Sequence, residues 1–208
     1  MPPISTLLPF FGISLLLGLT PGPDNVFVLL QSAMRGPRAG MIVVFGLCSG
    51  LLVHTAVVAV GLGALLAASK IAFTILKSAG ALYLAYLAWR AFRAPVGVVN
   101  TDSSESIGTG HMYRRGVLMN LTNPKVIIFF IAFLPQFVVA DRGPISLQIT
   151  LLGIIFIAAT LIVFSAIAYF SGVFGQLLLR SARAQRSLNW FAGVVFLGLA
   201  VKLASTHL

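Results

Sequence analysis

The sequence predicts an all-α integral membrane protein of about six transmembrane helices, arranged as two inverted three-helix halves. Three observations lead to this fold class: the composition, long runs without charge, and a proline break in the first helix of each half. Of the 208 residues, 59% are hydrophobic and only 9% are charged. A soluble domain has roughly 45–50% apolar and about 25% charged residues. This small number of charged side chains cannot cover the surface of a soluble protein. Lipid must therefore surround most of this chain.

The apolar runs define the expected spans. A bilayer core about 30 Å thick needs roughly 20 apolar residues in a helix, and residues 41–68 and 143–179 contain no Asp, Glu, Lys or Arg. A five-span count, with the termini on opposite sides, is the alternative. The whole chain, 1–208, is expected to form one transmembrane domain with halves of about 1–96 and 112–208. The six predicted spans are about 4–33, 40–67, 71–92, 116–139, 145–178 and 188–204, with a polar linker at about 94–111.

The basic residues set the orientation. The net charge is +10, but these residues sit in short segments between apolar runs rather than on one polar face, so no nucleic-acid partner is expected. With the N-terminus outside, nine Lys and Arg fall in inner loops and three in outer ones. Basic loops resist translocation, so both termini are predicted to be periplasmic. The inner set is Arg35, Arg38, Arg90, Arg93, Arg114, Arg115, Arg180, Arg183 and Arg186, and the outer set is Lys70, Arg142 and Lys202.

Each half begins with a span that is interrupted by proline. The first break comprises Thr20, Pro21, Gly22, Pro23, Asp24 and Asn25, and the second comprises Thr122, Asn123, Pro124 and Lys125. Each half crosses the membrane three times, an odd number, so the second half must have the opposite orientation to the first. Asp24 precedes the inner Arg35 by 11 residues, and Lys125 follows the inner Arg115 by 10. At about 1.5 Å per residue both breaks lie roughly 15 Å from the inner boundary. This is half the thickness of the bilayer core, so both breaks are expected at the midplane. Paired breaks of this kind indicate a transporter's binding site.

The breaks carry ionisable side chains. Asp24 is the only acidic residue within a predicted span, and a charge at the bilayer centre costs at least about 2.5–3.5 kcal/mol unless it finds a partner or a proton. It could hold a substrate ammonium, serve as the carboxylate of a proton antiporter, or pair with Lys125. Lys125 could receive a substrate carboxylate or neutralise Asp24 between transport steps. Asn123 is expected to cap a half-helix that starts at Pro124, whose positive end would suit a carboxylate.

Other polar residues are weaker candidates for the cavity. Lys77 could instead extend to the interface, and His54 could relay protons or simply bond to a neighbouring backbone. Gly46 and Gly50 are spaced for a close helix crossing. The full set of cavity candidates is Asn120, Thr122, Thr20, His54, Lys77, Tyr83 and Tyr86.

Several function classes are disfavoured. One cysteine, Cys48, provides no dithiol pair, and no nucleophile, base and orienting residue fall at one depth, so neither an enzyme nor a cofactor is expected. A metal site would need several more ligands than the spans supply, so none is predicted. Two alternatives to a metabolite exporter remain: a metal- or small-ion exporter of related architecture, and a membrane scaffold without transport. The sequence is also compatible with a homo-oligomer.

Four segments together are similar to those of a known family. They are LTPGPDN at 19–25, LKSAGALYLAYL at 76–87, RGVLMNLTNPK at 115–125 and FLPQF at 133–137. The chain resembles the lysine exporter / homoserine-threonine resistance family over nearly its whole length, apart from Ala88 where that family has glycine. The resemblance implies a multi-pass exporter of homoserine-, threonine- or lysine-like amino acids or derivatives in the bacterial inner membrane, working by proton antiport. It also implies that both proline breaks are functional.

Overall fold

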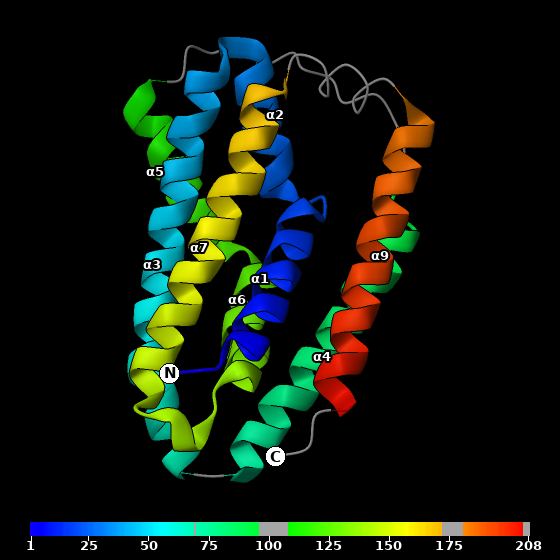
Figure 1. Ribbon diagram of the computed structural model, residues 1–208. Helices are drawn as coiled ribbons and strands as arrows, with labels where there is room; N and C mark the ends of the chain where they lie inside the picture. The colour runs from blue at the N-terminus through cyan, green and yellow to red at the C-terminus, as the bar shows by residue number, and fades with distance from the viewer. Residues whose placement is uncertain (69, 96–107, 172–180, 206–208) are drawn as a thin grey trace.

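The computed structural model describes residues 1–68, 70–95, 108–171 and 181–205, and these are helical apart from short connections (Figure 1). Most of the predicted linker (96–107) and the end of the fifth predicted span (172–178), as well as Arg180, lie outside the described residues. Helix α5 begins at Thr109, inside the predicted linker. The main helices are α1 (Ile4–Leu19), α2 (Pro23–Arg35), α3 (Pro37–Ala68), α4 (Lys70–Phe92), α5 (Thr109–Thr122), α6 (Pro124–Ile128), α7 (Ile145–Tyr169) and α9 (Ala182–Ser205).

Helices α3, α7 and α9 are long and apolar enough to cross a membrane. Two bent pairs could each form one further span: α1 with α2, bent by 63°, and α5 with the segment Pro124–Phe137, bent by 50°. By length and composition the described residues therefore contain three to five candidate spans. Helix α4, the third predicted span, has 23 residues and packs along α9. The count of six and the two inverted halves remain predictions.

The local sequence explains where the bent pairs break. A residue before proline is pushed out of the helical region, because its backbone would clash with the proline ring. Thr20 precedes Pro21, and Gly22 precedes Pro23; both adopt extended backbone angles. Asn123, before Pro124, is extended as well. The second break then starts a helix as predicted: Pro124 is the first helical residue, and the Asn123 side chain accepts a hydrogen bond from the Lys125 backbone N–H at 3.0 Å.

The fourth predicted span is less regular than expected after its break. Helix α6 has only five residues and continues as a π-helical segment, Phe129–Phe133, and then as a 3-10 segment, Leu134–Phe137. Pro135 lies in the first turn of the 3-10 segment, where its missing N–H is tolerated. The half-helix is therefore too short and irregular to act as one long dipole.

Helices α3 and α5 cross with their backbones in contact. A Cβ atom at Gly46 would overlap the Tyr113 carbonyl oxygen, and one at Gly116 would lie 2.6 Å from the Val43 carbonyl oxygen. A Cβ at Gly50 would lie 2.7 Å from Asn120 Oδ1. The glycine spacing on α3 thus serves close packing, as predicted, and brings Asn120 against α3.

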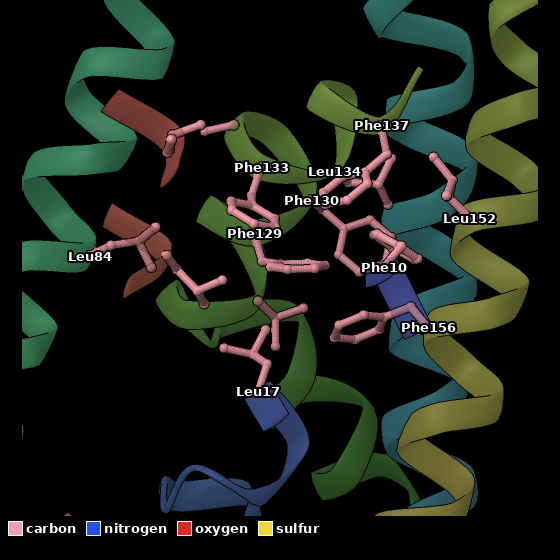
Figure 2. Packing of buried hydrophobic residues seen from close by; sticks show 14 of the residues in the cluster. Phe10, Leu17, Leu84, Phe129, Phe130, Phe133, Leu134, Phe137, Leu152 and Phe156 are labelled. Atoms are coloured by element: carbon pink, nitrogen blue, oxygen red, sulfur yellow. The ribbon is translucent and has the colours of Figure 1, made fainter. Parts of the chain in front are cut away.

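Within the larger core cluster six phenylalanines pack ring against ring, and we call them the aromatic cluster: Phe10, Phe129, Phe130, Phe133, Phe137 and Phe156. Figure 2 shows their rings together where α1 and α7 meet the segment after the second break. The rings of Phe129 and Phe156 are 4.8 Å apart and those of Phe10 and Phe137 are 4.9 Å apart. A second core cluster, which includes Val28, Leu47 and Phe164, joins α2, α3 and α7.

Candidate functional site

The first break frees the last carbonyl groups of α1, and side chains satisfy them. Asn25 Nδ2 donates to the Gly18 carbonyl at 2.7 Å. Lys125 Nζ donates to the carbonyl oxygens of Leu17 and Thr20 and to Thr20 Oγ1, each at 3.3 Å. A helix C-terminus is its negative end, so a lysine is favourably placed there. The lysine of the second break therefore caps the helix that ends at the first break.

The second break reaches back to the first through Asn123. While its Oδ1 caps α6, its Nδ2 donates to Asp24 Oδ2 at 2.7 Å. Asp24 itself lies in the first turn of α2, the positive end of that helix. One amide side chain thus links the carboxylate of the first half to the backbone of the second.

Asp24 and Lys125 are both buried, with 3% and 8% of their surface exposed. They lie close enough to attract each other electrostatically and they line the same pocket. Within the part of the chain that the structure describes, no hydrogen bond or ion pair joins the two side chains directly. Asp24 is held by Asn123 instead, and Lys125 by α1.

A small pocket lies between the two breaks. Its volume is about 20 Å³, which is room for about one water molecule. Asp24 Oδ1 and Asn120 Oδ1 are buried oxygens without a hydrogen-bond partner among the residues that the structure describes. Both residues line the pocket, so its polar side offers acceptors. The lining comprises Leu17, Gly18, Asp24, Leu47, Leu51, Asn120, Lys125, Val126, Phe156, Thr160 and Phe164.

The expected carboxylate seat at the start of α6 does not match this arrangement. Asn123, the cap of that helix, already bonds the Asp24 carboxylate. Lys125 has three protons, and three oxygens of α1 accept from Nζ. A substrate carboxylate at this place would face Asp24, a like charge, so the geometry favours a cation.

The weaker candidates fall into two groups. Thr20 and Asn25 belong to the network at the breaks, while Pro21, Gly22 and Pro23 shape the first break. His54 contacts the Asn120 carbonyl oxygen at 3.3 Å, outside the pocket lining. Thr122 is exposed and bonds the Leu118 carbonyl of its own helix at 2.8 Å, so the structure does not support it as a cavity residue.

The α4 candidates lie away from the pocket. The rings of Tyr83 and Tyr86 are 5.9 Å apart, and the guanidinium of Arg90 lies over the exposed Tyr86 ring. Lys77 is half-buried and does not line the pocket. These three residues therefore belong to the surface of the α4–α9 pair rather than to the pocket.

Sequence reasoning missed the pocket residues from α3 and α7. Thr160, Phe156 and Leu47 line it, but each sits in a helix that is apolar on nearly every side, where periodicity selects no face. A lone threonine in an apolar run carries no distinguishing signal. No group of three or more His, Cys, Asp or Glu that could hold a metal ion occurs among the described residues.

Comparison with known proteins places the chain in a family of transporters. The LysE type translocator family matches residues 15–207. The chain is 33% identical over 194 residues to a homoserine/homoserine lactone efflux protein of Salmonella typhi, a match that covers 93% of each protein. It is also 33% identical over 189 residues to an uncharacterized membrane protein of Vibrio cholerae, covering 90% of each. No solved structure matches the chain. The resemblance predicted from the four segments is confirmed, and the chain belongs to the LysE type translocators.

Proposed function

We propose that this protein exports amino acids or close derivatives, of the homoserine, threonine or lysine class, from the cytoplasm in exchange for protons. The observation that carries the proposal is a pair of buried oxygens, Asp24 Oδ1 and Asn120 Oδ1, that have no hydrogen-bond partner among the described residues and belong to residues that line one pocket. A substrate ammonium can donate to both oxygens, and it supplies the positive charge that a buried carboxylate needs. The name of the Salmonella typhi relative supports a cargo with an amino group.

The rest of the pocket suits a small, partly apolar cargo. Leu47, Leu51 and Phe164 line it beside the polar residues. Apolar walls around a few polar groups are typical of sites for small molecules, in which the polar groups fix the orientation. Asp24 and Asn120 would hold the amino end while the aliphatic part of the cargo contacts these walls.

Transport would proceed by alternating access. The pocket has room for about one water molecule, so it must widen to admit the cargo. The aromatic cluster lines the pocket through Phe156, and the second core cluster lines it through Leu47 and Phe164. Opening each cluster in turn would expose the site to one side of the membrane. In this scheme six spans lie in the bacterial inner membrane, with both termini in the periplasm.

Everted membrane vesicles provide the test. Vesicles containing the protein are given labelled L-homoserine, L-threonine or L-lysine with and without a proton gradient. Export predicts gradient-dependent accumulation of at least one of them. Asp24→Asn should abolish accumulation at unchanged protein level, whereas the same substitution at the exposed Asp141 should leave it intact. Equal accumulation by the native protein and Asp24→Asn would contradict the proposed site.

The same vesicles separate the alternatives. A metal- or small-ion exporter would move none of the labelled amino acids and would instead alter the tolerance of the cells to metal salts. A scaffold without transport would do neither, and it would not depend on Asp24.

A further inference from the structure

Asp24 needs a positive partner or a proton at every stage of a transport cycle. Its Oδ2 accepts from Asn123, while its Oδ1 is buried and has no partner in the described part of the chain. A buried carboxylate that is not neutralised is strongly destabilising. The cargo's ammonium can neutralise it in the loaded protein, but the empty protein must use another cation. Lys125 is the lysine that lines the same pocket.

In the structure, Lys125 stands away from Asp24. Its Nζ lies 3.3 Å from three uncharged oxygens, those of Leu17 and Thr20 at the end of α1. Strong bonds from an ammonium to a carboxylate are shorter, about 2.7–2.9 Å. The Thr20 hydroxyl donates its own proton to the Leu17 carbonyl oxygen, so towards Nζ it can only accept. A neutral amine can still occupy the same place, because its two protons can go to the two carbonyl oxygens and no carboxylate there requires a positive charge. The end of α1 is thus a resting place for Lys125 that does not require the positive charge.

The charge on Lys125 depends on few neighbours. Helix α2 contributes Asp24, and α1 contributes only carbonyl groups and the Thr20 hydroxyl. Helices α3 and α7 contribute apolar side chains and Thr160 to the lining. A further titratable group, His54 on α3, contacts the Asn120 backbone and does not line the pocket. Whether the Lys125 ammonium is stable therefore depends on Asp24 and on what Asp24 already binds.

We infer that Lys125 carries the exchanged proton, and that its ammonium and the cargo's ammonium alternate as the counter-ion of Asp24. This inference rests on the proposed function. In the empty protein, protonated Lys125 pairs with Asp24. On the cytoplasmic side the cargo's ammonium takes its place, and Lys125 is left beside a second cation without a counter-ion. Two like charges close together in a buried site are unfavourable. Nζ therefore releases one proton to cytoplasmic water and moves to the end of α1.

The cycle closes on the other side of the membrane. The cargo leaves to the periplasm, Nζ takes one proton from periplasmic water, and the ammonium returns to Asp24. Each cycle moves one cargo molecule out and one proton in, and only an N–H bond is broken and re-formed. The arrangement in the structure, with Lys125 Nζ at the end of α1, corresponds to the stage at which the cargo's ammonium pairs with Asp24.

Purified protein in liposomes tests the inference with labelled L-homoserine as the probe. Two rates are measured: accumulation driven by an acidic lumen, and exchange of labelled for unlabelled homoserine without a gradient. Lys125→Met should lose accumulation by at least about tenfold while its exchange rate stays within about threefold, because exchange never requires the empty protein to return. Asp24→Asn should lose both rates. Lys77→Met, the same substitution away from the pocket, should keep both.

The other outcomes are decisive as well. If Lys125→Met still accumulates homoserine, another group carries the proton. If a correctly inserted Lys125→Met loses exchange too, Lys125 binds the cargo, and the inference is wrong although the proposed function stands. A native protein that moves neither homoserine nor any other amine probe overturns the proposed function and this inference together.

A second measurement does not depend on the variant inserting. Homoserine is added to the purified native protein in weakly buffered detergent solution with a pH indicator dye. Binding should release protons, up to one per bound molecule, and native protein that binds homoserine without any release overturns the inference. Release that persists in Lys125→Gln assigns the proton to Asp24 instead.

Discussion

Replacing Asn123 by alanine should destabilise the protein through two separate losses. The cap on α6, a hydrogen bond of 3.0 Å from the Lys125 N–H, disappears, which typically costs about 1 kcal/mol, with a range of about 0.5–2 kcal/mol. The 2.7 Å bond to Asp24 Oδ2 disappears as well, and a hydrogen bond to a charged group contributes about 1.5–3 kcal/mol. Together the substitution should cost about 2–5 kcal/mol.

The thermal midpoint of the purified protein in mild detergent measures this cost. For a chain of this size a change of 1 kcal/mol shifts the midpoint by about 2–4 °C, so the expected decrease is about 4–20 °C. A double-mutant cycle separates the two losses. In an Asp24→Leu background the amide has no carboxylate to bond, so Asn123→Ala should cost only the cap there, about 1 kcal/mol with a range of about 0.5–2 kcal/mol. Equal costs in the two backgrounds would refute the link between the two halves.

Three further substitutions probe the packing that surrounds the site. Gly46→Ala should sharply reduce the yield of folded protein, because a Cβ there would overlap a backbone carbonyl of α5, whereas Gly61→Ala, on the same helix with nothing within 4 Å, should not. Phe129→Ala, at a fully buried position, should cost about 3–5 kcal/mol in thermal or chemical unfolding, compared with little for the exposed Phe191→Ala. Gln148→Leu removes three hydrogen bonds to the loop before α7 and should make that loop the first site of limited proteolysis.

The backbone at the breaks could be predicted from the sequence because local sterics control it. The proline rings restrict Thr20, Gly22 and Asn123 whatever the rest of the protein does, and all three are extended in the structure. The same local logic identified Asn123 as the cap of α6. The spacing from the basic loops predicts the same membrane depth for Asp24 and Lys125, and both line one pocket in the structure.

The partners of these side chains could not be predicted. Sequence reasoning considered Asp24 and a substrate as partners of Lys125, but the carbonyl groups freed at the end of α1 compete for its ammonium. Which of these wins depends on the relative positions of α1 and α6, and no residue pattern encodes that. The pocket residues of α3 and α7 could not be predicted either, because the sequence of a helix that is apolar on all sides does not show which face points inward.

The two breaks together account for the chemical asymmetry of the pocket. Breaking α1 exposes a negative helix end, and breaking the second span exposes a positive one. Lys125 lies on the first, and Asn123 holds Asp24 beside the second. The two side chains are not equally satisfied, since three oxygens accept from Lys125 Nζ whereas Asp24 keeps one oxygen without a partner among the described residues. A cargo that enters this pocket therefore gains more from presenting a cation than an anion, so we expect selection for the free amino group, with the carboxyl group of less weight.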